Sequence, residues 1–172
     1  MRQSRGFTLV ELIIVITLIG AMVAIAIPSM TNWSSSYQLK AATRDLYSAA
    51  LKARSEAAKR HANCALTFNI AGQDYIVYVD AERDFKFDGT EEIILQQTLP
   101  AGIRFDTSKG GGDGLAIANS NDTPAKPSIV FRPNGIPIKA DPGLTEGDAY
   151  LINNKGDEKS VHFGFAGNVR IN

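Results

Sequence analysis

The sequence predicts an α+β protein in which one long N-terminal helix precedes an antiparallel β domain, and three observations support this fold class. The segment from Phe7 to Ile27 is apolar and carries a single charge, Glu11. Leu and Ala recur at helical spacing between residues 39 and 57. The remaining chain consists of short apolar segments separated by Gly, Asn and Pro. Strands that follow a helix, rather than alternate with helices, favour α+β over α/β.

The apolar segment and the part that follows are expected to form one helix from Phe7 to about Ala62, ~80 Å long at about 1.5 Å per residue. One face of its second half would lie on a sheet, and carries Leu39, Ala42, Leu46, Ala49, Ala53 and Ala57. We expect the helix to loosen near Pro28 or the serines at residues 34–36, and to end at Asn63.

The opposite face of this second half is basic, with Lys40, Arg44, Lys52, Arg54, Lys59 and Arg60. Two interpretations of this face stay open. It is either a patch for nucleic acid or lipid headgroups, or an ordinary solvated face, since Asp45 and Glu56 lie among the cations.

The first part of the predicted helix is long enough to cross a membrane. Phe7 to Pro28 comprises 22 residues, or ~33 Å of helix against a hydrocarbon core of about 30 Å. Arg2 and Arg5 precede it, so the N-terminus is expected in the cytoplasm and the chain after Pro28 on the far side.

Three other interpretations of this segment compete with a membrane helix that has a further task. Ala24-Ile25-Ala26 offers a small-x-small cleavage pattern, but the apolar run exceeds the roughly 7–15 residues of a secretory signal. A helix in a soluble core rarely runs from Leu12 to Ile27 without a charge. A plain anchor has no use for Glu11, because intramembrane ionisable residues normally pair. No Lys, Arg or His lies between Phe7 and Lys40, so the partner of Glu11 is expected from elsewhere.

The stretch GFTLVEL at residues 6–12, between a basic leader and a membrane-length apolar run, resembles the leader junction of type IV prepilins and type II secretion pseudopilins. The resemblance covers residues 2–28. It implies that a prepilin peptidase cuts between Gly6 and Phe7 and N-methylates Phe7. It also implies that Glu11 acts in assembly, and that the helix packs against the helices of other pilins or pseudopilins.

The physical chemistry of Glu11 agrees with that role. Cleavage would create an ammonium group at Phe7, and Glu11 of one subunit would neutralise the ammonium group of a neighbour. Removing one partner of a buried ion pair costs about 3–5 kcal/mol. We therefore predict that Glu11 docks the amino terminus of a neighbouring subunit.

The chain after residue 63 is predicted to be β-structure. Alternating apolar and β-branched residues indicate strands, at residues 64–70, 74–80, 92–99, 103–105, 128–131, 149–153, 161–165 and 168–171. Ala71-Gly72-Gln73 joins the first two strands as a hairpin, and Pro133-Asn134-Gly135 forms a turn. Residues 106–127 are rich in Gly, Asn and Ser, and are predicted to be a mobile surface loop.

Two patterns in this β half, IVFRPNGIP at residues 129–137 and VHFGFAGNVRI at residues 161–171, resemble the FimT/GspH branch of minor pilins and minor pseudopilins. Some members of this branch bind DNA through two arginines in the C-terminal turn. Here the first of these positions holds Asn168 and only Arg170 remains. Arg170 is therefore a candidate nucleic-acid contact, although the missing arginine argues against DNA binding.

The sequence lacks the patterns of common enzymes and metal sites. Its histidines are His61 and His162 and its one cysteine is Cys64, which excludes the common zinc patterns. Ser160 and Asp157 lie near His162 in sequence, but no nucleophile elbow is present. We predict no enzymatic activity, no metal and no cofactor, and a buried Cys64.

The predicted organisation is a leader at residues 1–6, a long helix at residues 7–62 whose part 7–28 is the transmembrane or filament-core segment, and a globular β domain at residues 63–172. The resemblance implies a minor pilin or pseudopilin of the bacterial inner membrane, with a periplasmic domain, that helps to initiate or cap a type IV pilus or a type II secretion pseudopilus. The alternatives are a pilus-associated DNA-uptake or adhesion subunit and an anchored periplasmic enzyme. The net charge of zero gives no general signal for nucleic acid.

Overall fold

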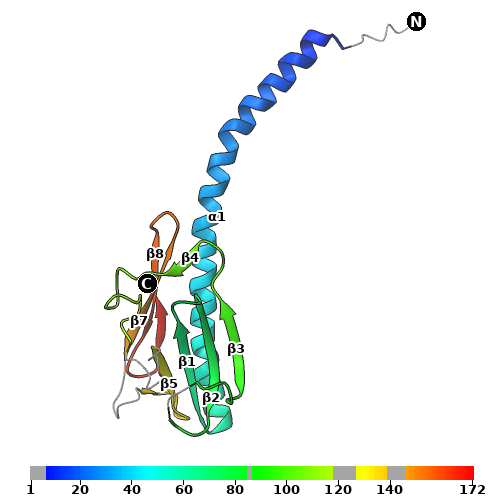
Figure 1. Ribbon diagram of the computed structural model, residues 1–172. Helices are drawn as coiled ribbons and strands as arrows, with labels where there is room; N and C mark the ends of the chain where they lie inside the picture. The colour runs from blue at the N-terminus through cyan, green and yellow to red at the C-terminus, as the bar shows by residue number, and fades with distance from the viewer. Residues whose placement is uncertain (1–6, 85–86, 118–126, 139–145) are drawn as a thin grey trace, which may run out of the picture.

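The computed structural model describes residues 7–84, 87–117, 127–138 and 146–172, with the backbone alone for residues 24–33. In these parts one helix, α1 (Leu9–Arg60), precedes the strands. The strands are β1 (Asn63–Asn69), β2 (Asp74–Asp80), β3 (Ile93–Thr98), β4 (Ile103–Phe105), β5 (Ser128–Phe131), β6 (Pro137–Ile138), β7 (Gly147–Asn153), β8 (Glu158–Phe163) and β9 (Val169–Ile171). The α+β fold is confirmed, and Figure 1 shows the first half of α1 projecting from the β domain while the second half lies along it.

Local backbone chemistry sets both ends of α1. Thr8 is the N-cap, and its side chain accepts a hydrogen bond from the N–H of Glu11 at 3.2 Å. At the other end His61 takes the left-handed conformation, with φ 53°, and is the C-cap. The expectation that Asn63 ends the helix is wrong, because the chain has already turned at His61 and Asn63 begins β1.

Helix α1 runs unbroken for 52 residues, or ~78 Å. The expected loosening near Pro28 or residues 34–36 is absent, because both positions have α-helical backbone. A proline inside a helix removes one N–H donor, but its fixed φ is itself helical. The helix bends gently over its length instead of breaking, as Figure 1 shows.

The strands form two antiparallel sheets. Sheet A has the order β3-β2-β1-β5-β6, and sheet B has the order β4-β7-β8-β9. The predicted hairpin is β1–β2, and the predicted C-terminal meander is β7-β8-β9. The sequence pattern does not indicate β6, because two residues that include Pro137 are too short to show alternation.

The core lies between the second half of α1 and the inner faces of both sheets. All six residues of the predicted helical stripe are buried, at 0–2% exposure. Phe68 on β1 joins the sheets, because its ring centroid lies 5.9 Å from that of Phe105 on β4 and 6.4 Å from that of Phe163 on β8. Both contacts are edge-to-face, a favoured arrangement of aromatic rings. Cys64 is buried as predicted, and burial raises the pKa of its thiol to about 11.

Residues 106–117 form turns, and residues 107–109, 111 and 112 are exposed as predicted for a surface loop, but the part around Leu115 is packed against sheet B. Leu115 is 1% exposed and bridges to β7. The N–H of Tyr150 on β7 donates to the carbonyl of Gly114 at 2.9 Å. The prediction of a surface loop is wrong for Leu115 and Ile117, whose apolar side chains are buried within the glycine-rich segment. The rest of the predicted loop, residues 118–126, lies outside the described residues.

A single contact joins α1 to one turn from each sheet, and we call it the Arg54 joint. It consists of Arg54 on α1, Gly135 in the turn between β5 and β6, and Gly167 in the turn between β8 and β9. The Nη1 atom of Arg54 donates to the carbonyl of Gly167 at 2.9 Å. A Cβ at Gly135 would lie 2.7 Å from Nε of Arg54, and a Cβ at Gly167 would overlap the carbonyl of Gly135. Only glycine fits both positions, which also have φ of 76° and 77°.

Replacing Gly167 with Ala is expected to destabilise the protein more than the same change at Gly156. Both glycines have positive φ, 77° and 85°, so both variants carry an alanine in the left-handed region. A Cβ at Gly156 meets open space, whereas at Gly167 it overlaps Gly135. Since overpacking costs about 1–3 kcal/mol, Gly167→Ala should lose at least ~1 kcal/mol more free energy of unfolding. Chemical denaturation of the full chain in detergent measures the difference, and equal losses would contradict the close fit.

Candidate functional site

The first half of α1 presents a continuous apolar surface that no other described part of the chain covers. Its large side chains between residues 7 and 23 are 44–77% exposed, and they are Phe7, Leu9, Val10, Leu12, Ile13, Ile14, Val15, Ile16, Leu18, Ile19, Met22 and Val23. Monomeric soluble proteins rarely expose apolar patches beyond a few hundred Å², and larger patches mark contacts with protein or membrane. This apolar half of α1, which projects from the domain in Figure 1, is the first candidate interaction surface.

Within the described residues, no helix combines the length and the apolar character that crossing a membrane requires. The predicted span at residues 7–28 ends among residues 24–33, whose side chains lie outside the description. The predicted leader at residues 1–6, including Gly6, lies outside it as well. Cleavage between Gly6 and Phe7 and methylation of Phe7 stay predictions, with the side chain of Phe7 itself 77% exposed.

Glu11 has a hydrogen-bonding partner in its own chain. Its Oε2 atom accepts from the backbone N–H and from the hydroxyl of Thr8, each at 3.0 Å. Together with the bond from the N–H of Glu11 to Oγ1 of Thr8, these contacts complete a capping box. These donors are uncharged, so the expectation that a cation for Glu11 comes from elsewhere stays a prediction. Considering cations alone does not anticipate the bonds from Thr8.

The signal for this cap is readable in the sequence. Thr8 and Glu11 stand three residues apart ahead of an apolar run, which is the spacing of a capping box. The bonds with Thr8 use Oε2 of Glu11, and Oε1 accepts none from the described residues. The carboxylate keeps an acceptor for a further donor, and the docking role of Glu11 stays a prediction.

Arg170, the candidate nucleic-acid contact, is exposed on β9 and pairs in register with His162 on β8. His162 pairs in turn with Asp148 on β7, where Nδ1 lies 3.1 Å from Oδ1. These three residues form one row across sheet B, and the carboxylate in that row repels phosphate. Asn168, which stands where the resemblance places another arginine, lies with its amide against Gly164. The turn between β8 and β9 therefore supplies no second arginine of its own, and the arginine that reaches it from α1, Arg54, donates to the carbonyl of Gly167.

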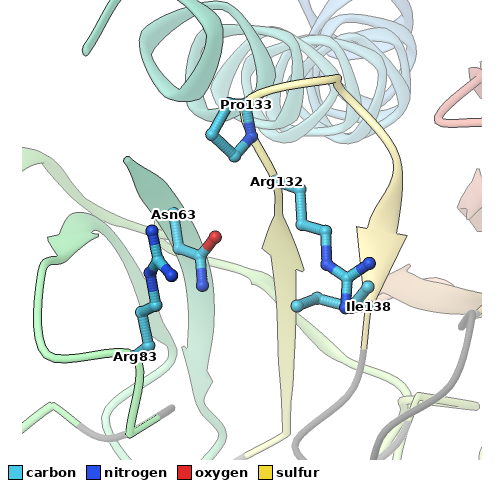
Figure 2. Close-up of a pocket in the computed structure, with 5 residues that line it drawn as sticks. All are labelled: Asn63, Arg83, Arg132, Pro133 and Ile138. Atoms are coloured by element: carbon cyan, nitrogen blue, oxygen red, sulfur yellow. The ribbon is translucent and has the colours of Figure 1, made fainter. Parts of the chain in front are cut away.

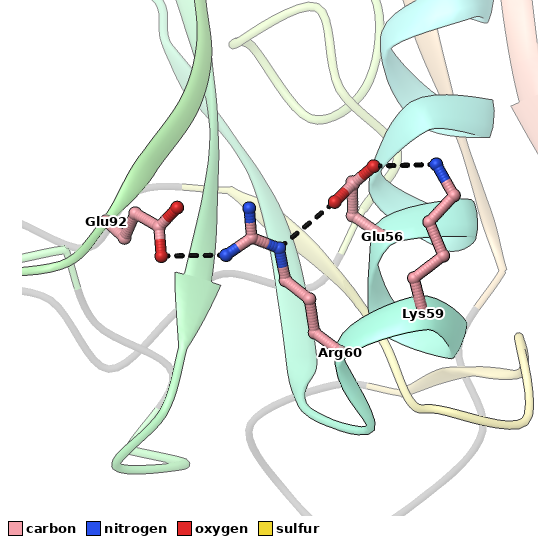
Figure 3. A network of polar contacts seen from close by, with 4 residues as sticks. All are labelled: Glu56, Lys59, Arg60 and Glu92. Atoms are coloured by element: carbon pink, nitrogen blue, oxygen red, sulfur yellow. Dashed lines mark hydrogen bonds and ion pairs between the residues drawn. The ribbon is translucent and has the colours of Figure 1, made fainter.

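The basic face of α1 is neutralised near its C-terminal end, as Figure 3 shows. Glu56 accepts from Lys59 and from Nε of Arg60, each at 3.0 Å. Nη1 of Arg60 reaches Glu92, just ahead of β3, at 2.7 Å. Hydrogen bonds from Lys59 and then Arg60 lower the pKa of the Glu56 carboxyl. These contacts favour the interpretation of an ordinary solvated face over that of a nucleic-acid patch.

The three residues considered for a catalytic triad do not share a site. His162 faces Asp148, whereas Asp157 accepts from the hydroxyl of Ser36 on α1 at 2.9 Å. Ser160 is buried on β8, at 9% exposure. Across the described residues, no group of three His, Cys, Asp or Glu side chains lies close enough to hold a metal ion.

Comparison with known protein families gives two matches. The family described as type II transport protein GspH matches residues 42–166, and the prokaryotic N-terminal methylation motif matches residues 1–27. The pilin-like protein PilA1 of Thermus thermophilus is 30% identical over 139 residues, which cover 78% of this chain and 80% of that protein. A fimbrial protein of Pseudomonas aeruginosa is 40% identical over 58 residues, covering 34% of this chain and 36% of that protein.

Two solved structures resemble this fold. The type IV minor pilin FimU of Pseudomonas aeruginosa has a TM-score of 0.55 at 15% identity, over 81% of this chain and 92% of that one. The minor pseudopilin EpsH from the type 2 secretion system of Vibrio cholerae has a TM-score of 0.51 at 10% identity, over 78% of this chain and 96% of that one. At these identities the similarity concerns the fold alone.

Replacing Arg54 and Arg170 separately with Gln is expected to distinguish a structural arginine from an exposed one. Arg54→Gln removes the charged donor to the carbonyl of Gly167, and hydrogen bonds to charged groups contribute about 1.5–3 kcal/mol when buried. Because Arg54 is only half-buried, we expect a loss of ~1 kcal/mol. Arg170→Gln should change stability by less than about 0.5 kcal/mol. Thermal unfolding of both full-length variants measures the effects, and equal losses would contradict the role of Arg54.

Proposed function

We propose that this chain, which belongs to the GspH family of type II transport proteins, is a minor subunit that helps to initiate or cap a type IV pilus or a type II secretion pseudopilus. The family consists of structural pilin-like subunits rather than enzymes. The observation that carries the proposal is the apolar half of α1, which is exposed on all sides from Phe7 to Val23. A structural subunit needs such a surface because its partners cover it.

The partners that fit this surface best are the equivalent helices of other pilins or pseudopilins. An apolar rod exposed on all sides is buried most completely by parallel helices around it. Gly20 leaves its side of the rod open, because a Cβ there would meet nothing within 4 Å. Small residues let neighbouring helices approach closely.

Before assembly, we propose that the same helix holds the subunit in the bacterial inner membrane, with the β domain in the periplasm. The basic pair Arg2 and Arg5 ahead of the apolar run supports this orientation. The methylation motif at residues 1–27 supports processing by a prepilin peptidase. In the proposed maturation, the peptidase cuts between Gly6 and Phe7 and methylates Phe7.

We propose that Glu11 then has two tasks. Through Oε2 it caps the start of α1, and through Oε1 it accepts the ammonium group of Phe7 from a neighbouring subunit. The tasks are compatible because they use different oxygens. In the apolar interior of a filament, an ammonium group without such a partner would be costly to bury.

DNA uptake is the weaker alternative. Arg170 is exposed, but it lies in a row with the carboxylate of Asp148, and Asn168 replaces the other expected arginine. A single exposed cation gives little affinity, since nucleic-acid binding relies on several phosphate contacts. Salt-dependent DNA binding by the full chain, lost in Arg170→Gln, would favour this alternative.

Gly6→Ala is expected to block removal of the leader when the chain is co-expressed with a prepilin peptidase. The wild-type protein should lack residues 1–6 and carry one methyl group on Phe7, because the junction resembles the substrate of that enzyme. Intact-mass spectrometry distinguishes the two forms. Ser4→Ala, a change inside the leader away from the junction, serves as the control and should be processed. Full processing of Gly6→Ala would contradict the assigned junction.

Three variants separate the charge of Glu11 from its capping role. Glu11→Gln keeps a side chain that suits a capping box but removes the charge, Thr8→Val removes the cap but keeps the charge, and Glu11→Val removes both. Because breaking a buried ion pair costs about 3–5 kcal/mol, both Glu11 variants should enter filaments at least about tenfold less than the wild type. Thr8→Val should assemble almost normally. The measurement is the ratio of subunit in sheared filaments to subunit in membranes.

Leader removal is measured in the same three strains, so that failed processing is not mistaken for failed assembly. Wild-type incorporation of Glu11→Gln would refute the docking role. If Thr8→Val and Glu11→Val failed while Glu11→Gln assembled normally, the carboxylate would matter only as a helix cap.

A further inference from the structure

A second candidate site lies on the β domain, at the end away from the projecting half of α1. It is a pocket of about 370 Å³ lined by Asn63, Arg83, Arg132, Pro133 and Ile138. Figure 2 shows Asn63 and Arg83 on one side, Arg132 with Ile138 on the other, and Pro133 at the rim. Since Asn63 begins β1 just after α1 ends, the pocket and the apolar half of α1 occupy opposite ends of the molecule.

The guanidinium groups of Arg83 and Arg132 form no hydrogen bond or ion pair with any described residue. Two other arginines that contact the β domain are engaged. Arg54 donates to the carbonyl of Gly167, and Arg60 pairs with glutamates. Two unengaged guanidinium groups at one concave surface form a site for a negatively charged group.

Arg83 is held at the pocket by a short turn in which its backbone takes the left-handed conformation. Its φ is 60°, and the other non-glycine residues described with positive φ are His61 and Gln73. His61 caps α1, and Gln73 closes the β1–β2 turn, where its side chain donates to the carbonyl of Ile70 at 2.6 Å. Around Arg83, the N–H of Asp84 donates to Oδ1 of Asp80 at 3.2 Å. This bond closes the turn that presents the Arg83 side chain to the pocket.

We propose that this pocket binds an acidic segment of a partner protein, with a carboxylate between Arg83 and Arg132 and a neighbouring apolar side chain against Pro133 and Ile138. Arginine matches a carboxylate in a two-pronged geometry. A peptide would also cover the apolar side chains of Pro133 and Ile138, whereas a small free anion would leave them exposed to water. This inference does not depend on the role proposed for Glu11, because the two sites are at opposite ends of the chain.

The surroundings of the pocket favour an acidic peptide over a nucleic acid. Arg83 lies within the sequence DAERD, so Asp80, Glu82 and Asp84 flank it along the chain. These carboxylates repel an extended polyanion, which carries many phosphates past them, more than they repel a short segment with one or two carboxylates. The net charge of the whole chain is zero, which offers no long-range attraction for a phosphate backbone.

The test uses the full-length protein in detergent micelles and a fluorescently labelled peptide, acetyl-Leu-Glu-Ile-Glu-amide, followed by fluorescence anisotropy. The same peptide with Gln in place of Glu is the matched ligand control. We expect saturable binding of the acidic peptide, and at least about tenfold weaker binding of the Gln peptide, since each lost charged hydrogen bond reduces affinity by about that factor. A labelled oligothymidylate in the same assay tests for nucleic acid.

Arg83→Gln and Arg132→Gln are each expected to weaken binding of the acidic peptide by about tenfold. Arg104→Gln on β4 removes one charge from another exposed arginine and should leave the affinity unchanged. Matching thermal unfolding curves show that the variants are folded. Absence of saturable binding, an equal loss in Arg104→Gln, or tighter Arg83-dependent binding of the oligothymidylate would each overturn the proposal.

Discussion

The fold depends on the small side chains along one face of α1, because they allow two sheets to pack against the same helix. The buried stripe in the second half of α1 consists mainly of alanine, with Ala42, Ala49, Ala53 and Ala57 all at 0–1% exposure. The side chain of alanine is a single methyl group, so strands of both sheets can approach the helix closely. Helix α1 contacts β1 and β2 of sheet A as well as β7, β8 and β9 of sheet B. Larger residues would push the sheets outward and separate Phe68 from its aromatic partners in sheet B.

The Arg54 joint completes this arrangement at the ends of the strands. The two sequence patterns that resemble the FimT/GspH branch, at residues 129–137 and 161–171, are distant in the chain but meet there. A Cβ at Gly167 would overlap the carbonyl of Gly135, and a Cβ at Gly135 would meet the side chain of Arg54. These patterns therefore record a packing constraint between the two sheets. Close packing alone therefore explains why glycine occupies both positions, without any ligand bound there.

The sequence is sufficient to predict the elements whose signal is periodic or local. The stripe on α1, the hairpin around Gly72 and the C-terminal meander follow from spacing and turn chemistry. Burial of Leu115 was hidden by the glycines around it, since only the assembled sheet B shows the space that it fills. The pairing of Arg54 with Gly167 joins residues 113 positions apart, which no local pattern reveals. The spacing of Thr8 and Glu11 is enough to predict the capping box, but considering only oppositely charged partners for Glu11 misses it.

One continuous element links the two proposed sites. Helix α1 runs for 52 residues, and its second half packs against both sheets, so the apolar half extends from the same helix that carries the β domain. One end offers an apolar rod with a single carboxylate, and the other offers two guanidinium groups over an apolar lining. A two-fold contact pairs one surface with itself, whereas two different surfaces at opposite ends of a subunit suit head-to-tail contacts. If both proposed sites bind other subunits, such contacts build an open filament whenever the rotation between subunits does not close a ring.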